Sequence, residues 1–509
     1  MDFWSNLATG FGTALTPTNL VYAFVGCVTG TLVGVLPGIG SVTTVALLIP
    51  ITFGLNPTSG LILMAGVYYG AMYGGSTTSI LANIPGESSA VVTTLDGHPM
   101  AKQGRAGAAL ATAAIGSFVA GTLSTVGLML LAPALARVAI TFGPTEYFSM
   151  MLLGLTAVSA LAGRSVAKAL VSMCAGLLLG TVGLDMGGFP RFTFGLVELY
   201  EGIDFLIPAI GLFAIAEALD QAGIVRRAEV QRFEFKGRAW LTREEFRQSV
   251  APWFRGSVLG FVVGVLPGAG ATIASFFSYA LERRVSRHPE RFGKGAIEGV
   301  AGPEAANNAS VGGAMVPLLT LGIPGSGTTA VLLGAFMMFG LQPGPLLLER
   351  NADVVWALIA SMYIGNVMLL ILNLPLIRLF VKVIDVRPAI LAASVLMLSA
   401  VGVYANNGRT FDLWLTLGFG ILGYWARRAD FPAAPAILAL VLERSMEDNF
   451  RRATTLSDGS LTIFVTRPIS AFILALCVFS LCSPYVQAWF LSRRNRDSTT
   501  AAGVSRDGV

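Results

Sequence analysis

The stretch VGVLPGIG at Val33–Gly40 returns almost unchanged as VGVLPGAG at Val263–Gly270. Each copy closes a ladder of glycines spaced by four residues. The ladders are Gly26, Gly30, Gly34 and Gly38, and then Gly256, Gly260, Gly264 and Gly268. A second pair of interruptions, Ile84–Gly86 and Ile323–Gly325, follows in the same order with the sequence Ile-Pro-Gly. Two apolar halves broken by Pro-Gly at matching places are typical of transporters built from repeats.

The composition indicates a membrane protein. Of its 509 residues, 54% are hydrophobic and only 12% are charged, with a mean hydropathy of +0.70. Soluble domains carry about 25% charged residues. Apolar runs of roughly 17–25 residues recur along the sequence, which predicts an all-α polytopic membrane protein. The net charge of +5 comes from basic residues in short loops, so it indicates orientation rather than nucleic-acid binding.

Nine helical spans are expected from the apolar runs. They are 107–136, 146–162, 166–183, 204–222, 352–377, 389–405, 411–426, 431–443 and 469–491. If each crosses once, most basic loops fall on one side, which is then cytoplasmic. Arg137, Arg191 and Arg409 are exceptions on the other side.

The segment 257–281 is long enough to cross the membrane, yet basic residues flank it on both sides. A re-entrant hairpin that enters and leaves on the cytoplasmic side, with its tip at Leu266–Gly268, removes this conflict. Its counterpart, 20–50, has no basic flank before Lys102, which suits a hairpin entering from outside. The repeats would then be inverted, each with a re-entrant hairpin and a broken transmembrane helix. The alternative is a simple broken span in each half.

The expected organisation has four parts. They are a first membrane repeat at 1–221, a cytoplasmic connector at 222–252, a second repeat at 253–491 and a disordered cytoplasmic tail at 492–509. The glycine ladders predict close helix packing, because glycine lets two backbones approach. They are therefore not counted as ligands.

The four interruptions are the candidate binding site. Proline stops a helix, and the next half-helix presents free N–H groups and a positive dipole end to an anion. In lipid, such free backbone groups are tolerated only where protein or a water-filled cavity satisfies them. The predicted substrate-binding residues are Pro37, Gly38, Gly40, Ser41, Asn83, Pro85, Gly86, Glu87, Pro267, Gly268, Gly270, Asn307, Asn308, Pro324, Gly325, Ser326 and Gly327.

A coupling cation would need oxygen ligands near the same breaks. The residues proposed for it are Ser76, Thr77, Glu304 and Thr328. Glu304 qualifies because an ionisable residue at membrane depth is costly. The alternative for Glu304 is an interfacial acid that caps a helix, and helix capping is also the alternative for Asn307 and Asn308. No cofactor is expected beyond a possible Na⁺, and with only two histidines, both in polar loops, no other metal site is expected.

Several longer motifs resemble the TctA type of large membrane subunit in the tripartite tricarboxylate transporter family. They are GTLVGVLPGIG (Gly30–Gly40), YYGAMYGGSTTSILANIPGE (Tyr68–Glu87), DGHPMAKQGRAG (Asp96–Gly107), VLGFVVGVLPGAGATIASF (Val258–Phe276) and EGVAGPEAANNASVGGAMVPLLTLGIPGSGTTA (Glu298–Ala330). The resemblance runs from Leu20 to about Tyr485. His98 stands where the family often has tyrosine, in a loop.

This resemblance implies a multi-pass permease of the bacterial cytoplasmic (inner) membrane. Its partners would be a small four-span membrane subunit and a periplasmic solute-binding protein that delivers a carboxylate. Uptake would be driven by Na⁺ or H⁺. The resemblance names neither the carboxylate, the ion stoichiometry nor the oligomeric state.

The sequence leaves two other kinds of transport protein open. A channel-like organic anion pore could use the same breaks, and so could the membrane subunit of a different three-component carboxylate carrier. The sequence has no GxxxxGK[ST] for ATP, no HExxH and no GxSxG. An intramembrane enzyme is disfavoured because it would need a paired nucleophile and base at membrane depth, whereas both histidines lie in loops and the acids are unpaired. A purely structural subunit is disfavoured because it would not need duplicated helix breaks.

Overall fold

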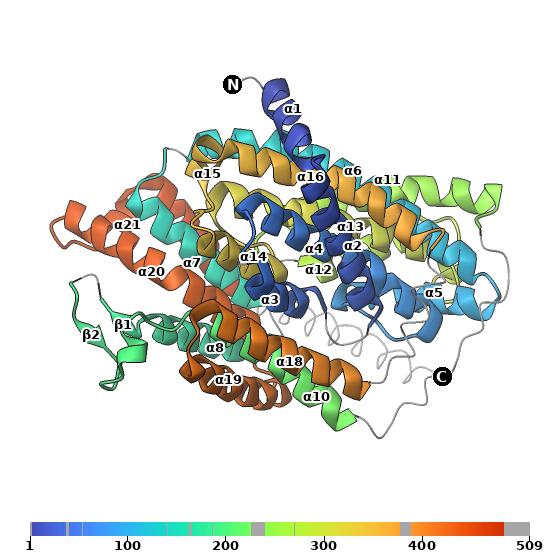
Figure 1. The fold of residues 1–509 in the computed structure, drawn as a ribbon. Coiled ribbons are helices and arrows are strands. Elements are labelled where there is room, and N and C mark those ends of the chain that lie inside the picture. Colours follow the sequence, from blue (N-terminus) through green and yellow to red (C-terminus); the bar gives the residue numbers. More distant parts are fainter. Residues whose placement is uncertain are drawn as a thin grey trace, which may run out of the picture.

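The computed structural model describes residues 3–36, 40–52, 54–139, 141–161, 165–185, 187–224, 240–268, 270–376 and 388–482. Its first helices are α1 (Phe3–Ala14), α2 (Pro17–Val35), α3 (Gly40–Thr52), α4 (Pro57–Ala82), η1 (Ser88–Ala90), α5 (Thr93–Lys102), α6 (Ala106–Ala139), α7 (Pro144–Leu161) and α8 (Val166–Gly180). An antiparallel hairpin of β1 (Gly183–Leu184) and β2 (Pro190–Arg191) follows. Figure 1 shows it projecting at one end of the helical body.

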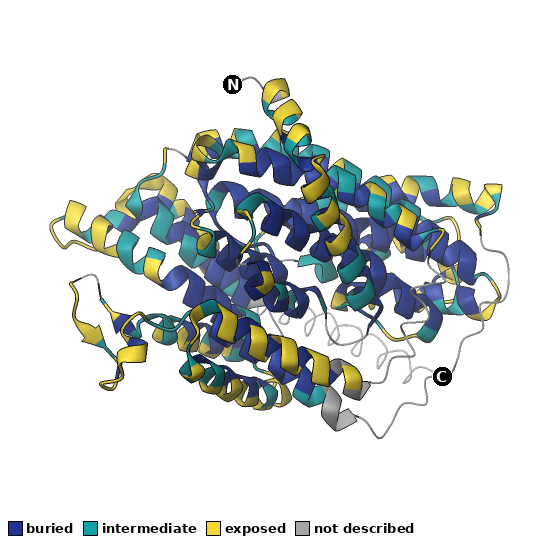
Figure 2. Ribbon diagram, viewed as in Figure 1, coloured by how far each residue is buried: buried dark blue, intermediate teal, exposed yellow. Residues whose placement is uncertain are grey.

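The remaining elements are helical. They are η2 (Val197–Leu199), α9 (Leu206–Ala209), the π-helical η3 (Ile210–Ile215), α10 (Ala216–Ile224), α11 (Arg243–Val265), α12 (Gly270–Val285), η4 (Pro289–Arg291), α13 (Glu298–Leu321), α14 (Gly327–Met338), α15 (Pro345–Arg350), α16 (Ala352–Asn373), α18 (Pro388–Asn407), α19 (Thr410–Arg428), α20 (Ala433–Leu456) and α21 (Ile463–Thr466). A last helix covers Pro468–Cys482. The helical core lies around α4, α13, α14 and α16, which Figure 2 shows largely buried.

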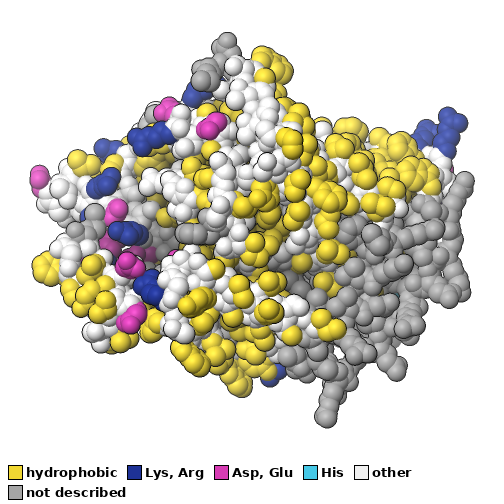
Figure 3. Space-filling view, viewed as in Figure 1, with side chains coloured by type: hydrophobic (Ala, Val, Ile, Leu, Met, Phe, Trp, Pro, Cys, Tyr) yellow, Lys and Arg dark blue, Asp and Glu magenta, His cyan; other side chains and the backbone are white. Residues whose placement is uncertain are grey.

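Three described helices are long and apolar enough to cross a membrane: α2, α6 and α16. Four shorter apolar helices, α3, α8, α14 and Pro468–Cys482, accompany them. On the face drawn in Figure 3, hydrophobic side chains cover the middle of the molecule, while charged side chains gather mainly at one end. The expectation of a helical membrane protein is confirmed, with the two-stranded hairpin as its small β element in the described chain.

Most expected spans coincide with helices to within a few residues, including α6, α7, α8, α18 and α19. The span expected at 431–443 was too short, because α20 continues to Leu456. The second half of α20 is polar, so a prediction based on hydropathy alone stops where the apolar residues end. Of the span expected at 469–491, the structure describes the helix to Cys482, and the tail at 492–509 lies outside the described residues.

The glycine ladders pack helices closely, as expected, and the two helices of each packed pair run parallel. A Cβ at Gly26, Gly30 or Gly34 of α2 would lie 2.3–2.4 Å from a carbonyl oxygen of α4, at Leu63, Val67 and Ala71 in turn. Gly256, Gly260 and Gly264 of α11 meet Gly302, Ala306 and Ser310 of α13 at the same 2.3–2.4 Å. No other residue type permits these backbone contacts.

The two glycine-packed helix pairs run in opposite directions relative to α6. Along α13, Asn308 bonds Ser117 of α6 and Gly312 then meets Ser124, so α13 and α6 are parallel. The Tyr73 hydroxyl of α4 donates to Asn366 Oδ1, and Asn366 Nδ2 donates to the Phe118 carbonyl of α6. Tyr73 therefore lies at about the same height as Phe118. Tyr69, one turn earlier on α4, lies beside Ser124, further along α6. Helix α4 is therefore antiparallel to α6.

Candidate functional site

The two Ile-Pro-Gly interruptions have the same backbone geometry. Helix α4 ends at the left-handed cap Asn83 (φ 57°), and α13 ends at the left-handed cap Gly322 (φ 70°). The next N–H then reaches back six residues, from Ile84 to the Thr78 carbonyl (3.3 Å) and from Ile323 to the Pro317 carbonyl (3.2 Å). Asn83 is thus a helix C-cap with an exposed side chain.

Gly86 and Gly325 are fixed by close packing. A Cβ at Gly86 would lie 2.0 Å from the carbonyl oxygen of Gly34, at the end of α2. One at Gly325 would lie 3.0 Å from that of Gly264, at the end of α11, and 2.8 Å from the Ala314 Cβ. Each broken helix therefore folds back onto the hairpin of its own half, with Pro85 and Pro324 one residue earlier.

A carboxylate lies at the amino end of α3. The Ser41 backbone N–H donates to Glu87 Oε1, and a Cβ at the neighbouring Gly40 would lie 3.6 Å from both carboxylate oxygens. The free N–H groups at a helix start attract anions. The structure therefore brings together three predicted residues, Gly40, Ser41 and Glu87, around an anion that belongs to the protein itself.

Hydroxyl groups join the two halves at the same place. Ser41 Oγ lies 2.9 Å from Thr328 Oγ1 at the start of α14, and Ser88 Oγ lies 3.0 Å from Thr272 Oγ1 at the start of α12. The Tyr68 hydroxyl lies 3.0 Å from Ser326 Oγ. All four interrupted segments are thus linked around the amino ends of α3, α12 and α14.

Ser326 also caps α14 in a capping box with Thr329, just before Gly327. Tyr68 and Ser88 were missing from the predicted site. Tyr68 and Ser88 flank the first broken segment, but nothing local shows that their hydroxyls point across to the other half.

The two Leu-Pro-Gly corners differ in what can be described. Pro37 and Gly38 lie outside the described residues. At the second corner Gly268 follows Pro267 with φ 79°, and a Cβ there would lie 2.6 Å from the Ala157 carbonyl oxygen of α7. Gly270 has φ 63° and open space around it. Glycine is therefore required at this corner by both conformation and packing.

Glu304, Asn307 and Asn308 lie in the interior of α13, and each is 0% exposed. The capping alternatives for these residues are therefore wrong. Glu304 accepts a hydrogen bond from the Thr93 hydroxyl of α5, and Asn308 Nδ2 donates to Ser117 Oγ at 2.7 Å.

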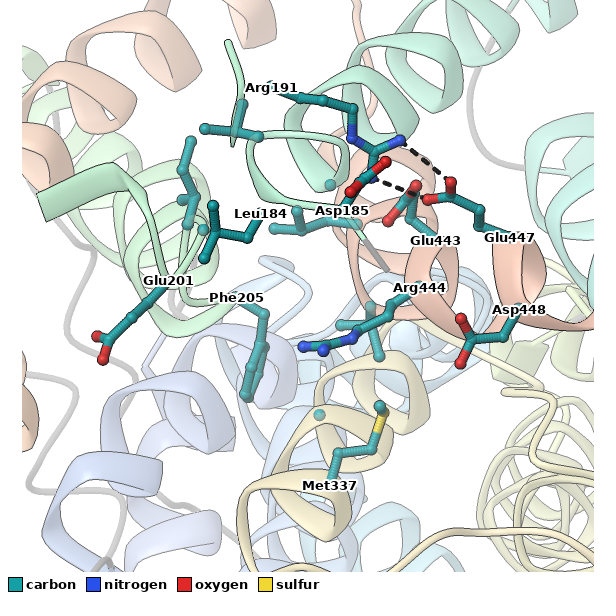
Figure 4. Close-up of a pocket in the computed structure, with 17 residues that line it drawn as sticks. Leu184, Asp185, Arg191, Glu201, Phe205, Met337, Glu443, Arg444, Glu447 and Asp448 are labelled. Carbon is teal, nitrogen blue, oxygen red and sulfur yellow. Dashed lines mark hydrogen bonds and ion pairs between the residues drawn. The ribbon is translucent and has the colours of Figure 1, made fainter. Parts of the chain in front are cut away.

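A separate hollow of about 220 Å³ opens beside the β hairpin (Figure 4). Arg191 forms a two-bond pair with Glu447 of α20, at 3.0 and 3.1 Å. The Arg191 hydrogen bond lowers the pKa of Glu447, despite partial burial. Met337, at the far end of α14 from Gly327, lines the hollow. The hollow lies away from the helix breaks, and more acidic than basic side chains line it, which disfavours the binding of an anion there.

The chain is similar along most of its length to a known protein family and to curated proteins. The sequence profile of the tripartite tricarboxylate transporter TctA family matches residues 20–438. An Agrobacterium vitis protein described as "Uncharacterized 52.8 kDa protein in TAR-I ttuC' 3'region" is 49% identical over 494 residues, or 96% of this chain and 98% of that protein. Another from the same organism, "Uncharacterized protein in TAR-II ttuC' 3'region", is 44% identical over 232 residues, 45% of this chain and 96% of its own length. No solved structure matches the chain.

Proposed function

Because the chain belongs to the tripartite tricarboxylate transporter TctA family, and is thus the large membrane subunit of such a transporter, we propose that it imports an organic carboxylate together with Na⁺ or H⁺. A periplasmic binding protein delivers the carboxylate, and a small four-span subunit completes the complex in the bacterial cytoplasmic membrane. The transport class follows from the family, whereas the cargo, the ion and the delivery step are the proposal.

Inverted repeats form the scaffold in this proposal. The hairpins α2–α3 and α11–α12 each enter and leave on one side, and α4 and α13 are the broken helices. The support is that α13 runs parallel to α6 and α4 antiparallel to it, although both make equivalent glycine contacts. Arg255, in the middle of α11, also bonds Glu282 near the end of α12, which holds the two helices of the second hairpin together.

The substrate carboxylates bind at the meeting point of the amino ends of α3, α12 and α14. The observation that supports this assignment is the hydrogen bond from the Ser41 N–H to Glu87, because the partner of this helix start is a side-chain carboxyl group. No Lys or Arg occurs in the segments 36–41, 83–88, 266–272 or 322–329. Recognition therefore rests on backbone N–H groups, helix dipoles and the hydroxyls of Ser41, Thr272 and Thr328.

Transport then requires the unit around the breaks to change its contacts with the remaining helices. The bonds Ser41–Thr328 and Ser88–Thr272 connect the two halves through single hydroxyl pairs. A neutral hydrogen bond contributes about 0.5–1.5 kcal/mol, so these contacts can exchange during a transport cycle.

Proteoliposomes containing the large and small subunits and the binding protein provide the test. We expect carboxylate uptake that depends on an imposed Na⁺ or pH gradient and is accelerated by carboxylate inside the vesicles. Uptake indifferent to both gradients would contradict the coupling. Uptake without acceleration from inside would indicate a channel-like pore rather than a carrier.

A further inference from the structure

Helix α13 carries one carboxylic acid and two adjacent amide side chains in its buried interior. Glu304, Asn307 and Asn308 are each 0% exposed, and almost every residue of α13 around them is buried as well. Positions i, i+3 and i+4 of a helix share one face, so the three side chains project in a common direction.

Their hydrogen-bonding capacity is not used up by the described part of the chain. Among the described residues, Glu304 Oε2, Asn308 Oδ1 and both polar atoms of the Asn307 amide have no hydrogen-bond partner. The Asn307 side chain neighbours the Glu304 carboxyl, but without the geometry of a hydrogen bond. Buried polar atoms in folded proteins are nearly always paired with protein, water or an ion, so this cluster calls for a further partner.

The unpaired atoms suit a small hard cation. Three of the four are oxygens: one from a carboxylate and two from amides. The bond to Glu304 comes from a neutral group, the Thr93 hydroxyl. One carboxylate with amide oxygens neutralises a monovalent ion, which removes the penalty of a lone charge at membrane depth. We propose that Glu304, Asn307 and Asn308 bind a Na⁺ ion through these oxygens.

The cluster lies close to the proposed carboxylate site. Ser275 of α12 donates to the Pro303 carbonyl of α13, and Gly302 packs against Ser278, so the two helices run antiparallel. One turn further along α13, Asn307 is level with the first turn of α12, where Thr272 meets Ser88. The inference rests on the proposed function, because it assigns the coupling ion of that transporter and places it beside the anion.

Na⁺ binding can be measured on the purified full-length protein without any transport assay. We expect NaCl, but not choline chloride at equal ionic strength, to raise the melting temperature with a saturable dependence. Asn307→Ala and Glu304→Gln should raise the half-saturating Na⁺ concentration by about tenfold or more. Asn307→Asp keeps an oxygen at the same position and should retain the Na⁺ response, which covers the case in which the alanine variant fails to fold.

Asn373→Ala is the matched control. Asn373 of α16 is also buried, has an unpaired Oδ1 and donates to Thr31, but lies on another helix. It should keep the wild-type Na⁺ response. A melting temperature indifferent to Na⁺ would overturn the proposal, and so would a Na⁺ response that survives in Asn307→Ala. Either result could occur with active uptake, whereas failure of the proposed function would appear as no carboxylate uptake under any gradient.

Discussion

Replacing Glu87 with alanine tests how the anion site works. In the structure Glu87 accepts the Ser41 N–H and so occupies the amino end of α3, where a substrate carboxylate would bind. A substrate that uses this helix end must first displace Glu87. We therefore expect Glu87→Ala to bind the carboxylate more tightly, and Glu87→Gln, which keeps an acceptor but loses the charge, to be intermediate.

The size of the effect follows from the bond that must break. A hydrogen bond to an ionised group contributes about 1.5–3 kcal/mol, and the helix dipole adds about 0.3–1 kcal/mol. The lower end, about 1.5 kcal/mol, corresponds to roughly tenfold tighter binding once the competitor is gone.

Equilibrium binding of a radiolabelled carboxylate to the purified protein is the appropriate assay, because turnover would mix binding with release. The exposed Glu290, which pairs only with His288 in the described structure, provides the control variant Glu290→Ala. Weaker binding in Glu87→Ala would refute the competition and show that Glu87 helps to hold the substrate or its ion.

Two further predictions concern stability. Gly86→Ala should lower the melting temperature strongly, by the equivalent of about 1–3 kcal/mol or more, because its Cβ would lie 2.0 Å from the Gly34 carbonyl oxygen. Gly418→Ala, with open space at its Cβ, should not, and equal losses would contradict this packing. Arg191→Ala should cost about 0.5–1 kcal/mol at neutral pH, since the pair with Glu447 is partly solvated. Because the folded-state pKa of Glu447 is lowered, this contribution is complete above the ordinary glutamate pKa and lost as pH falls through the lowered value. Melting curves of wild type and variant should therefore converge in acid, and a constant gap would contradict the assignment.

Much of the architecture could be predicted because its signals are local. Proline lacks a backbone N–H in any context, so the interruptions at Pro85 and Pro324 could be located. Long apolar runs favour the lipid phase regardless of their neighbours, so most spans could be located as well. The ladder spacing likewise predicted close packing, although not that α2 packs on α4 and α11 on α13. The length of α20 was missed because its second half is polar, so the apolar run ends before the helix does.

The sequence by itself determined where the helices break and that both halves break alike, since these properties belong to single residues and short spacings. Only the tertiary structure decided that Glu87 fills the start of α3 and that Ser41 meets Thr328. It also decided that Asn307 is buried with no hydrogen-bond partner among the described residues. Ser41 and Thr328 are 287 positions apart, and such contacts depend on how packed helices are directed and stacked. Local propensity carries no information about that arrangement.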